Sequence, residues 1–289
     1  MVNSIEKGTL YVVATPIGNL QDITYRAMNI LSSVDVILAE DTRMTAKLLT
    51  NLNIRGDQKL ISCHDFNEES RVEYVKELLD NDNSIALVSD AGTPLISDPG
   101  YKIVASLRNS GYKVVPVPGV SALITALSAA GLPSDSFLFK GFLSAKQAKR
   151  QQQIRDLLLA NATVIIYESV HRITYLLDDL LEIMPHNNIV VAKELTKQFE
   201  KFVAGSVEEV CDFFKSNPDI IRGEFVVVID CNNNNDISDQ SNLNVDIDDL
   251  LKDLLEDMPV KKAVKLVVKL TGAKKNDIYE RALAVKKDI

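Results

Sequence analysis

Residues 87–100 read LVSDAGTPLISDPG and continue an apolar run that begins at Ile85. A short apolar run of this kind is typical of a buried strand, and the two Gly and two Pro that follow favour a long loop of fixed shape. Asp90 stands where the predicted strand ends, so its carboxylate can accept hydrogen bonds from a ligand hydroxyl or amine. An ordinary turn with a capping Asp is the alternative. The loop has too few Gly and no Lys for a phosphate-binding P-loop.

Strands and helices alternate on both sides of this loop. The apolar pattern predicts strands at 10–14, 34–39, 85–89, 113–117, 163–168, 189–193 and 225–230. Helical patterns lie between them at 24–33, 100–110, 121–130 and 173–183. Such alternation predicts an α/β fold with a largely parallel sheet. A ligand site is expected in a cleft between its two halves.

We expect four parts along the chain. Residues 1–118 form an N-terminal α/β domain and residues 119–231 a C-terminal α/β domain. Residues 232–246, rich in Asn, Asp and Ser, form a flexible linker. Residues 247–289 form a small basic helical module of the helix-turn-helix type. An appendage used only for packing or dimerisation is the alternative for this module.

Composition sets limits on the class of protein. The chain has 289 residues, 46% of them hydrophobic, and a net charge of −8. No apolar run approaches the ~18 residues of a membrane helix, and no secretory signal is evident, so we expect a cytoplasmic protein without membrane association. The three Cys lack metal-binding spacing, and no metal is expected. Residues 260–289 carry a net charge of +6 and the rest of the chain −14. An acidic body with such a basic tail can still dock RNA, through the tail and a local patch.

Polar residues gather at other predicted strand ends. Residues 40–43 read EDTR, residues 62–68 contain His64, and a Lys–Glu pair stands at 193–194. Charge at a strand end costs desolvation unless it is paired or used, which makes these residues candidates for chemistry. Helix capping and salt bridges in a domain seam are the alternatives. Ser121, in the PGVSA stretch at 118–122, is expected to cap the helix that follows.

Taken together, these stretches resemble the tetrapyrrole methylase superfamily. Within it they are most similar to the bacterial enzymes that methylate a cytidine 2′-hydroxyl in small-subunit ribosomal RNA. The resemblance rests on seven motifs in order over residues 8–230, with the basic tail as an appended helix-turn-helix. The motifs are TPIGNLxDIT, AEDTR, SDAGTPLISDPG, PGVSA, GFL, YESxHR and KELTK.

This resemblance implies a homodimer that binds S-adenosylmethionine in the cleft between two α/β domains and acts on ribosomal RNA or the small ribosomal subunit. The cofactor contacts it implies are Pro16, Ser89, Asp90, Thr93, Ser121, Ala122, Glu168 and Leu195. Candidates for RNA contacts are Arg26, Arg43, Arg172 and Lys197. Candidates for activating the ribose hydroxyl or stabilising its alkoxide are Lys193 and Glu194, followed by His64 and Glu40.

Two rival functions stay open at this point. One is methylation of a tetrapyrrole such as a precorrin or uroporphyrinogen by an enzyme of the same fold. The basic tail and the charged strand ends disfavour it, because a macrocycle requires a more apolar cleft. The other is a non-catalytic RNA-binding assembly factor, which would not need the cofactor loops that this sequence retains.

Overall fold

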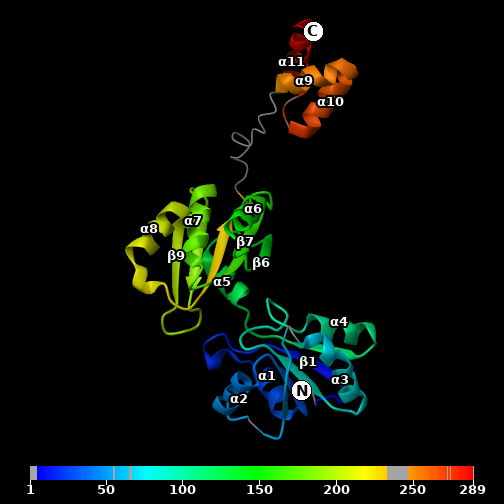
Figure 1. The fold of residues 1–289 in the computed structure, drawn as a ribbon, viewed down its shortest axis with the longest axis vertical. Helices are drawn as coiled ribbons and strands as arrows, with labels where there is room; N and C mark the ends of the chain where they lie inside the picture. The colour runs from blue at the N-terminus through cyan, green and yellow to red at the C-terminus, as the bar shows by residue number, and fades with distance from the viewer. Residues whose placement is uncertain are drawn as a thin grey trace. The chain divides into compact units, whose positions relative to one another are not determined.

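The computed structural model describes residues 5–54, 56–64, 67–232, 247–271, 273 and 275–288. The chain divides into two compact units, Met1–Asn232 and Asn233–Ile289. The first unit contains two five-stranded sheets (Figure 1). The predicted boundary at 118–119 falls between the two sheets and stays a prediction. Most of the predicted linker lies outside the described residues.

The first sheet is fully parallel and is the part of the fold that the opening stretch of sequence belongs to. Of its inner strands, Val36–Ala39 and Ile85–Val88 are buried along their whole length, as parallel strands covered on both faces should be. In spatial order the strands are β3 (Lys59–Ser62), β2 (Val36–Ala39), β4 (Ile85–Val88), β1 (Thr9–Val13) and β5 (Lys113–Val117).

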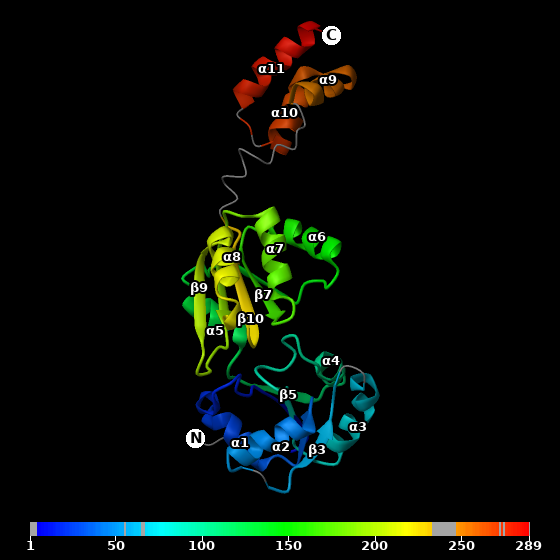
Figure 2. The ribbon, with the colours of Figure 1, turned by 60° about the vertical axis from the view of Figure 1, so that its left-hand side comes forward.

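Helices cover both faces of this sheet (Figure 2). On one face lie α1 (Tyr25–Ser33) and α2 (Thr42–Asn51), which contribute Leu31 and Leu49 to the core. On the other face lie α3 (Glu68–Asp80) and α4 (Tyr101–Asn109). The predicted strands and helices of this half are confirmed, with ends that differ by one or two residues.

The second sheet is mixed, which corrects the expectation of a largely parallel sheet. Its order is β6 (Phe137–Gly141), β7 (Thr163–Ser169), β10 (Glu224–Asp230), β8 (Asn188–Lys193) and β9 (Lys201–Ser206). Only β6 and β7 are parallel, whereas β10 runs antiparallel to both of its neighbours and β8 to β9. A short connection such as the one between β8 and β9 permits only antiparallel pairing, since a parallel pair needs a long crossover.

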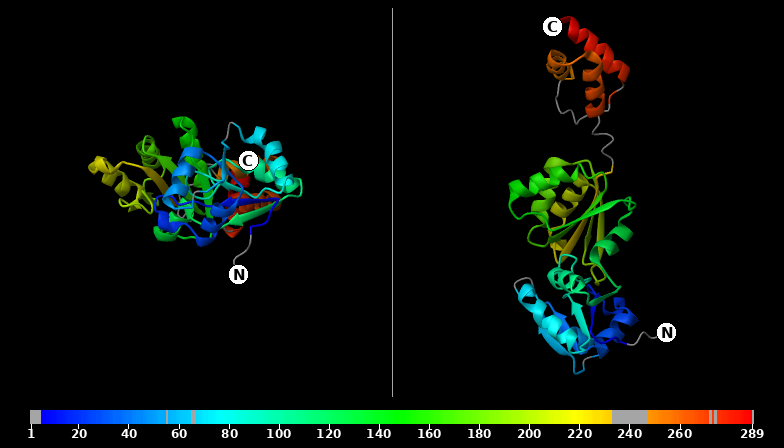
Figure 3. Two further views of the ribbon diagram at one scale, coloured as in Figure 1. Left: turned by 90° about the horizontal axis from the view of Figure 1, so that it is seen from below. Right: turned by 90° about the vertical axis from the view of Figure 1, so that its right-hand side faces the viewer.

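The helices of this half divide unequally between its two faces. The apolar side of α5 (Ala122–Ala130) covers one face alone. The opposite face carries α6 (Gln147–Leu157), α7 (Ile173–Ile183) and α8 (Val207–Ser216), seen from further directions in Figure 3. Two short 3-10 helices, Leu20–Asp22 and Pro218–Ile220, complete the unit.

The second unit is a bundle of three helices. It consists of α9 (Ile247–Asp257), α10 (Val260–Thr271) and α11 (Lys275–Asp288), which pack around Leu251, Val264 and Ile278. The predicted helices of the basic tail are therefore confirmed, while Gly272 of the predicted turn lies outside the described residues. Within the described part of the chain, no helix is both long and apolar enough to cross a membrane.

A buried ion pair joins α6 to α7. Arg150 Nε lies 2.5 Å from Asp179 Oδ2, and the two side chains are 5% and 2% exposed. Gln147 and Gln151 donate to the other oxygen of the same carboxylate, at 3.3 and 3.0 Å. Removing one partner of such a pair leaves an uncompensated buried charge.

We therefore expect Asp179→Ala to lower the free energy of unfolding by about 3–5 kcal/mol in urea denaturation. Its neighbour Asp178 is exposed on the same helix, so Asp178→Ala is the matched control and should change stability by less than about 0.5 kcal/mol. Equal effects of the two substitutions would contradict a structural role for the buried pair.

Candidate functional site

A cavity of about 340 Å³ lies where strand ends of the two sheets face each other. Parallel α/β sheets bind ligands at the carboxyl ends of their strands, and this volume is within the ~300–1,000 Å³ of small-molecule sites. The lining residues are Ile17, Glu40, Asp90, Ala91, Gly92, Thr93, Ile96, Ser97, Asp98, Ser121, Ala122, Phe142, Tyr167, Glu168, Ser169, Glu224, Phe225 and Val226.

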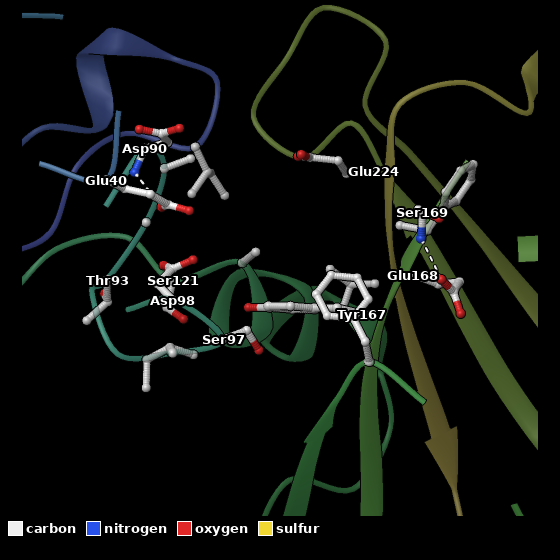
Figure 4. A pocket seen from close by; sticks show the side chains of 18 residues that line it. Glu40, Asp90, Thr93, Ser97, Asp98, Ser121, Tyr167, Glu168, Ser169 and Glu224 are labelled. Atoms are coloured by element: carbon white, nitrogen blue, oxygen red, sulfur yellow. Dashed lines mark hydrogen bonds between the residues drawn. The ribbon is translucent and has the colours of Figure 1, made fainter. Parts of the chain in front are cut away.

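Glu40 and Asp90 come from the ends of β2 and β4 and lie on one side of the cavity (Figure 4). Tyr167 and Glu168 lie on the other side, at the carboxyl end of β7. Glu224 reaches the same place because β10 starts there, antiparallel to β7. Mixed pairing in the second sheet thus brings residues distant in sequence to one wall.

The lining is acidic. It includes five carboxylates, on Glu40, Asp90, Asp98, Glu168 and Glu224, whereas no Lys or Arg is among the lining residues. Such a wall repels a polyphosphate and attracts a ligand that carries positive charge and several hydrogen-bond donors. Apolar side chains complete the lining and suit a flat ring.

Backbone hydrogen bonds connect the two first-sheet carboxylates. The amide of Asp41 donates to Asp90 Oδ1 at 3.0 Å, and the amide of Asp90 donates to Glu40 Oε2 at 3.4 Å. Partial burial in the cavity wall raises the pKa of the Asp90 carboxyl, while the hydrogen bond from Asp41 acts against this rise. The backbone after β2 thus holds the Asp90 carboxylate, and the backbone after β4 holds the Glu40 carboxylate.

The loop after β4 has a strained, fixed backbone. Leu95 and Ser97 adopt positive φ angles of 73° and 66°, although they are neither Gly nor Asn. Residues in such conformations persist only where surrounding contacts impose them, and they cluster at functional sites. Two hydrogen bonds between Thr15 and Gly92 (2.8 and 3.0 Å) and one from Thr93 Oγ1 to Val120 O (2.9 Å) supply those contacts. The loop is therefore a rigid wall.

A smaller cavity of about 40 Å³ adjoins the first and shares Ile17, Ala122, Glu224 and Val226 with it. Its other lining residues come from the loop after β8 and are Glu194, Leu195 and Lys197. This loop is also strained, since Glu194 and Thr196 have φ angles of 50° and 64°.

Two glycines make room for the loop after β8. A Cβ on Gly223 would lie 1.9 Å from Glu194 Oε1, and one on Gly18 would lie 2.5 Å from Lys197 Cγ. The Lys197 ammonium lies 3.0 Å from Glu194 Oε1. Close packing therefore explains why glycines occur at positions 18 and 223.

The structure brings together six of the residues named from sequence as site candidates. Glu40, Asp90, Thr93, Ser121, Ala122 and Glu168 line the main cavity. Glu194, Leu195 and Lys197 line the adjoining one. Pro16 and Ser89 are buried next to lining residues but do not line either cavity; the Ser89 hydroxyl has no hydrogen-bond partner among the described residues.

Lys193 and His64 lie outside both cavities. Lys193 is 5% exposed, and its ammonium donates to the carbonyl of Ile220 at 2.6 Å, so this geometry gives no support to contact with a ribose oxygen. His64 follows β3, where its ring contacts the Asn67 amide at 3.2 Å. Both residues stand at strand ends, as the sequence indicated, but their polar atoms form hydrogen bonds with other groups of the protein.

The arginines named as RNA contacts differ in their surroundings. Arg26 and Arg43 are exposed, and Arg43 Nη2 lies 2.6 Å from Asp41 Oδ2, which lowers the pKa of Asp41 to about 2. Arg172 is different, because it points inward. Its Nη2 donates to the carbonyl of Leu143 at 2.5 Å and lies 3.1 Å from Glu168 Oε2.

Tyr167 takes the capping role expected of Ser121. Ser121 occupies the N-cap position of α5, yet its side chain makes no capping hydrogen bond. Instead, the amide of Leu123 donates to the Tyr167 hydroxyl at 2.9 Å. Burial raises the pKa of Tyr167. The sequence contained Tyr167 in the YESxHR motif, but only the structure shows that its hydroxyl accepts a hydrogen bond from an amide in the first turn of α5.

Phe142, Ser97, Asp98 and Glu224 also line the cavity without having been singled out as site residues. Ser97 and Asp98 belong to the loop after β4, so their place in that motif was a usable signal. Phe142 is the central residue of the GFL motif, which was a usable signal as well. Glu224 lies in none of the seven motifs, and its position depends on how β10 pairs. Among the described residues, no group of His, Cys, Asp and Glu is arranged to hold a metal ion.

Comparisons with known proteins match both units. The sequence fits the family described as Tetrapyrrole (Corrin/Porphyrin) Methylases over residues 9–211, and the RsmI C-terminal HTH domain over residues 241–286. It is 40% identical to Ribosomal RNA small subunit methyltransferase I of Haemophilus influenzae, covering 96% of this chain and 97% of that protein. It is 44% identical to the protein of that name from Vibrio cholerae, covering 95% and 94%.

A solved structure shares the fold. Uroporphyrin-III C-methyl transferase from Thermus thermophilus, complexed with S-adenyl homocysteine, superimposes with a TM-score of 0.53 at 17% identity. The match covers 77% of this chain and 98% of that one. At this level of identity the similarity concerns the fold alone.

Proposed function

Because the chain belongs to the tetrapyrrole methylase family and, within it, to the ribosomal RNA small subunit methyltransferases I, we propose that it methylates a cytidine ribose of small-subunit ribosomal RNA at the 2′-hydroxyl, with S-adenosylmethionine as methyl donor. The family resemblance stated from sequence is confirmed. The structural observation behind the proposal is the acidic cavity, whose walls include loops with a strained backbone. The chain also aligns with these methyltransferases over nearly their whole length.

The residues present fit S-adenosylmethionine. This cofactor supplies a methyl group on a positively charged sulfonium, and it also carries an ammonium, a carboxylate, ribose hydroxyls and an adenine amine, so that its net charge is positive. The four lining carboxylates other than Glu168 are acceptors of the right charge for the sulfonium, the ammonium and the donor groups. The Glu168 carboxylate is buried against Arg172 instead. Asp90 is best placed to accept from a hydroxyl or amine, and Ala122 leaves room for a flat ring beside the start of α5.

Glu40 is our proposal for the general base. It is the candidate base that lies in the main cavity, and the amide of Asp90 fixes its carboxylate. A ribose hydroxyl is a poor nucleophile and gains from a base that accepts its proton as the new O–C bond forms. The cavity walls hold the reactants in line, which is the main demand of a displacement at a methyl carbon. Glu194, in the adjoining cavity, is the second candidate.

The acidic cavity also disfavours the tetrapyrrole alternative. Uroporphyrinogen and the precorrins are polycarboxylates, and a lining with five carboxylates and no cation repels such a substrate. The helical tail is a further difference, because it matches a domain described for the ribosomal relatives. We further propose a homodimer in the cytoplasm, on the basis of the family resemblance.

Methyl incorporation tests this function directly. Labelled S-adenosylmethionine is supplied with small ribosomal subunits, with naked small-subunit RNA, or with uroporphyrinogen. We expect label in the RNA, in an alkali-resistant dinucleotide that begins with cytidine, because a 2′-O-methyl group blocks alkaline cleavage. Label in uroporphyrinogen alone would establish the tetrapyrrole alternative. Cofactor binding in calorimetry without transfer to any of the three would refute the proposal.

Asp90→Ala is expected to weaken S-adenosylmethionine binding at least tenfold, about 1.4 kcal/mol, because the ligand loses a charged acceptor. Isothermal titration calorimetry measures the change. Asp90→Asn keeps an acceptor for the amide of Asp41 and separates loss of charge from loss of loop structure. Exposed Asp178, which does not line the cavity, provides the control Asp178→Ala. Unchanged affinity in a folded Asp90→Ala variant would exclude Asp90 from the site.

Glu40→Gln is expected to lower kcat by about 10²–10⁴-fold while cofactor affinity stays within about threefold, since it removes the base but preserves the side-chain shape. Single-turnover methylation of small subunits measures the rate. Glu224→Gln is the comparison variant, because it removes another lining carboxylate. An equal loss in both variants would indicate a general electrostatic effect and not proton transfer by Glu40.

The basic tail is expected to contribute RNA affinity and no chemistry. Lys261, Lys262 and Lys265 are exposed on α10, which contains four Lys and no acidic residue. A chain ending at Asn232 should bind S-adenosylmethionine normally, bind RNA more weakly, and show a shallower salt dependence, because fewer counterions are released. The full chain with Lys261→Gln, Lys262→Gln and Lys265→Gln should show part of the same loss. Equal salt slopes in all three proteins would leave the tail as a packing appendage.

A further inference from the structure

A second basic segment lies in the acidic body and carries Phe142, which lines the cavity. Residues 136–155 contain five Lys or Arg and no Asp or Glu, in a chain whose net charge is −8. They include β6, the loop after it and most of α6. Arg150 of this segment is buried in its pair with Asp179, whereas Lys140, Lys146 and Lys149 are exposed.

These three lysines are electrostatically available. None of their ammonium groups forms an ion pair with a described residue, whereas Lys7, Lys102 and Lys113 all pair with carboxylates. Unpaired, exposed ammonium groups are the side chains that replace counterions along a phosphate backbone.

Phe142 links this basic segment to the cavity. It lines the cavity and is 53% exposed, so its ring can be reached both by solvent and by a ligand in the cavity. Its ring is 6.0 Å from that of Tyr167 in an edge-to-face arrangement, so the ring is supported from one side. An exposed, supported aromatic ring next to unpaired cations is typical of surfaces that bind single-stranded RNA.

Side chains of α6 hold the loop that carries Phe142 by hydrogen bonds to its backbone. Arg150 Nη1 donates to the carbonyls of Ser144 and Ala145 at 3.4 and 3.3 Å, and Gln153 Oε1 accepts from the Ser144 amide at 2.8 Å. Arg172, which bonds both the Leu143 carbonyl and Glu168, connects the loop to the cavity wall. Arg172 is therefore a positioning residue, and the loop between β6 and α6 is ordered before any RNA binds.

Chain geometry limits how far the lysines lie from the cavity. Lys140 is two residues before Phe142 and Lys146 is four residues after it, so their Cα atoms lie within about 7 and 14 Å of that of Phe142. A distance of ~14 Å corresponds to about four stacked nucleotides at 3.4 Å each. One short stretch of RNA can therefore contact the aromatic ring and the flanking cations together.

We propose that Phe142 with Lys140, Lys146 and Lys149 forms a docking platform for single-stranded RNA, with Phe142 stacked on the base of the nucleotide to be modified. The lysines bind the phosphates on either side of that nucleotide. This inference rests on the proposed function, and it assigns the acidic body its own RNA contact in addition to the tail.

The phosphate contacts are tested with the triple variant Lys140→Gln, Lys146→Gln, Lys149→Gln and in vitro transcribed small-subunit RNA. We expect RNA affinity to fall about tenfold or more, and the slope of log K against log salt to fall by about 2, since each single-strand phosphate contact contributes ~0.7. Cofactor affinity in calorimetry should stay unchanged. The control Lys7→Gln, Lys102→Gln, Lys113→Gln alters net charge equally and should leave the slope unchanged.

Two results would overturn the phosphate contacts. The first is an equal loss of RNA affinity in the platform variant and the control. The second is unchanged affinity for naked RNA together with weaker binding of assembled subunits, which would show that the lysines contact a ribosomal protein. All six lysines are exposed, and thermal unfolding verifies that each variant is folded.

Phe142→Ala tests the stacking contact. We expect kcat/KM for the RNA to fall roughly 5- to 150-fold and cofactor affinity to stay within about twofold, with recovery in Phe142→Tyr, which keeps the ring. An equal fall in cofactor affinity would place Phe142 in the cofactor wall and overturn the stacking role. The RNA-binding measurements need no methyl transfer, so a wild-type chain that binds RNA through the platform but transfers no methyl would refute only the proposed function.

Discussion

The paired hydrogen bonds between Thr15 and Gly92 connect two loops that leave neighbouring parallel strands. Gly92 has a φ of 92°, where a side chain would be strained, and the following residues pass through two further left-handed positions. This constraint turns the long segment after β4 into one wall of the cavity. Asp90, Thr93 and Asp98 are held in that wall, so the acceptors that face a ligand are ordered before it binds.

The loop after β4 forms only one side of the cavity, and the second sheet provides the opposite side. Antiparallel pairing of β10 with β7 brings Glu224 and Phe225 opposite Ser169 and Glu168, at the edge that faces the loops of the first sheet. Tyr167 then supports the start of α5 through its hydroxyl and Phe142 through its ring. Residues from seven separate segments of the chain thereby line a single cavity.

Charge is separated along the chain in a way that fits two ligands of opposite sign. The cavity is acidic and suits a cationic cofactor, while unpaired lysines gather on β6, on the loop before α6 and on α10. An acidic body lowers non-specific attraction of RNA, so RNA is expected to bind where these lysines lie.

Much of this could be predicted from the sequence, because it depends on local pattern. Runs such as VILA in β2 and IALV in β4 are apolar at every position and must be buried on both faces, which predicts a parallel sheet and places Glu40 and Asp90 at its edge. The ordered motifs likewise predicted the family, and the Gly and Pro residues after β4 predicted a long loop of fixed shape. Their chemistry lies within a few consecutive residues.

Only the tertiary structure decided the direction of the second sheet, the burial of Lys193 beneath the Ile220 carbonyl, and the place of Phe142 beside Tyr167. β9 is a half-exposed edge strand with a weak pattern, and its pairing with β8 depends on a seven-residue connection whose course depends on contacts with Gly18 and Gly223. The sequence by itself determined which segments are strands, which are helices and which carry reactive side chains, because backbone preference and burial are encoded locally. The partners of those side chains were decided by packing between residues far apart in the chain, and no local pattern encodes such contacts.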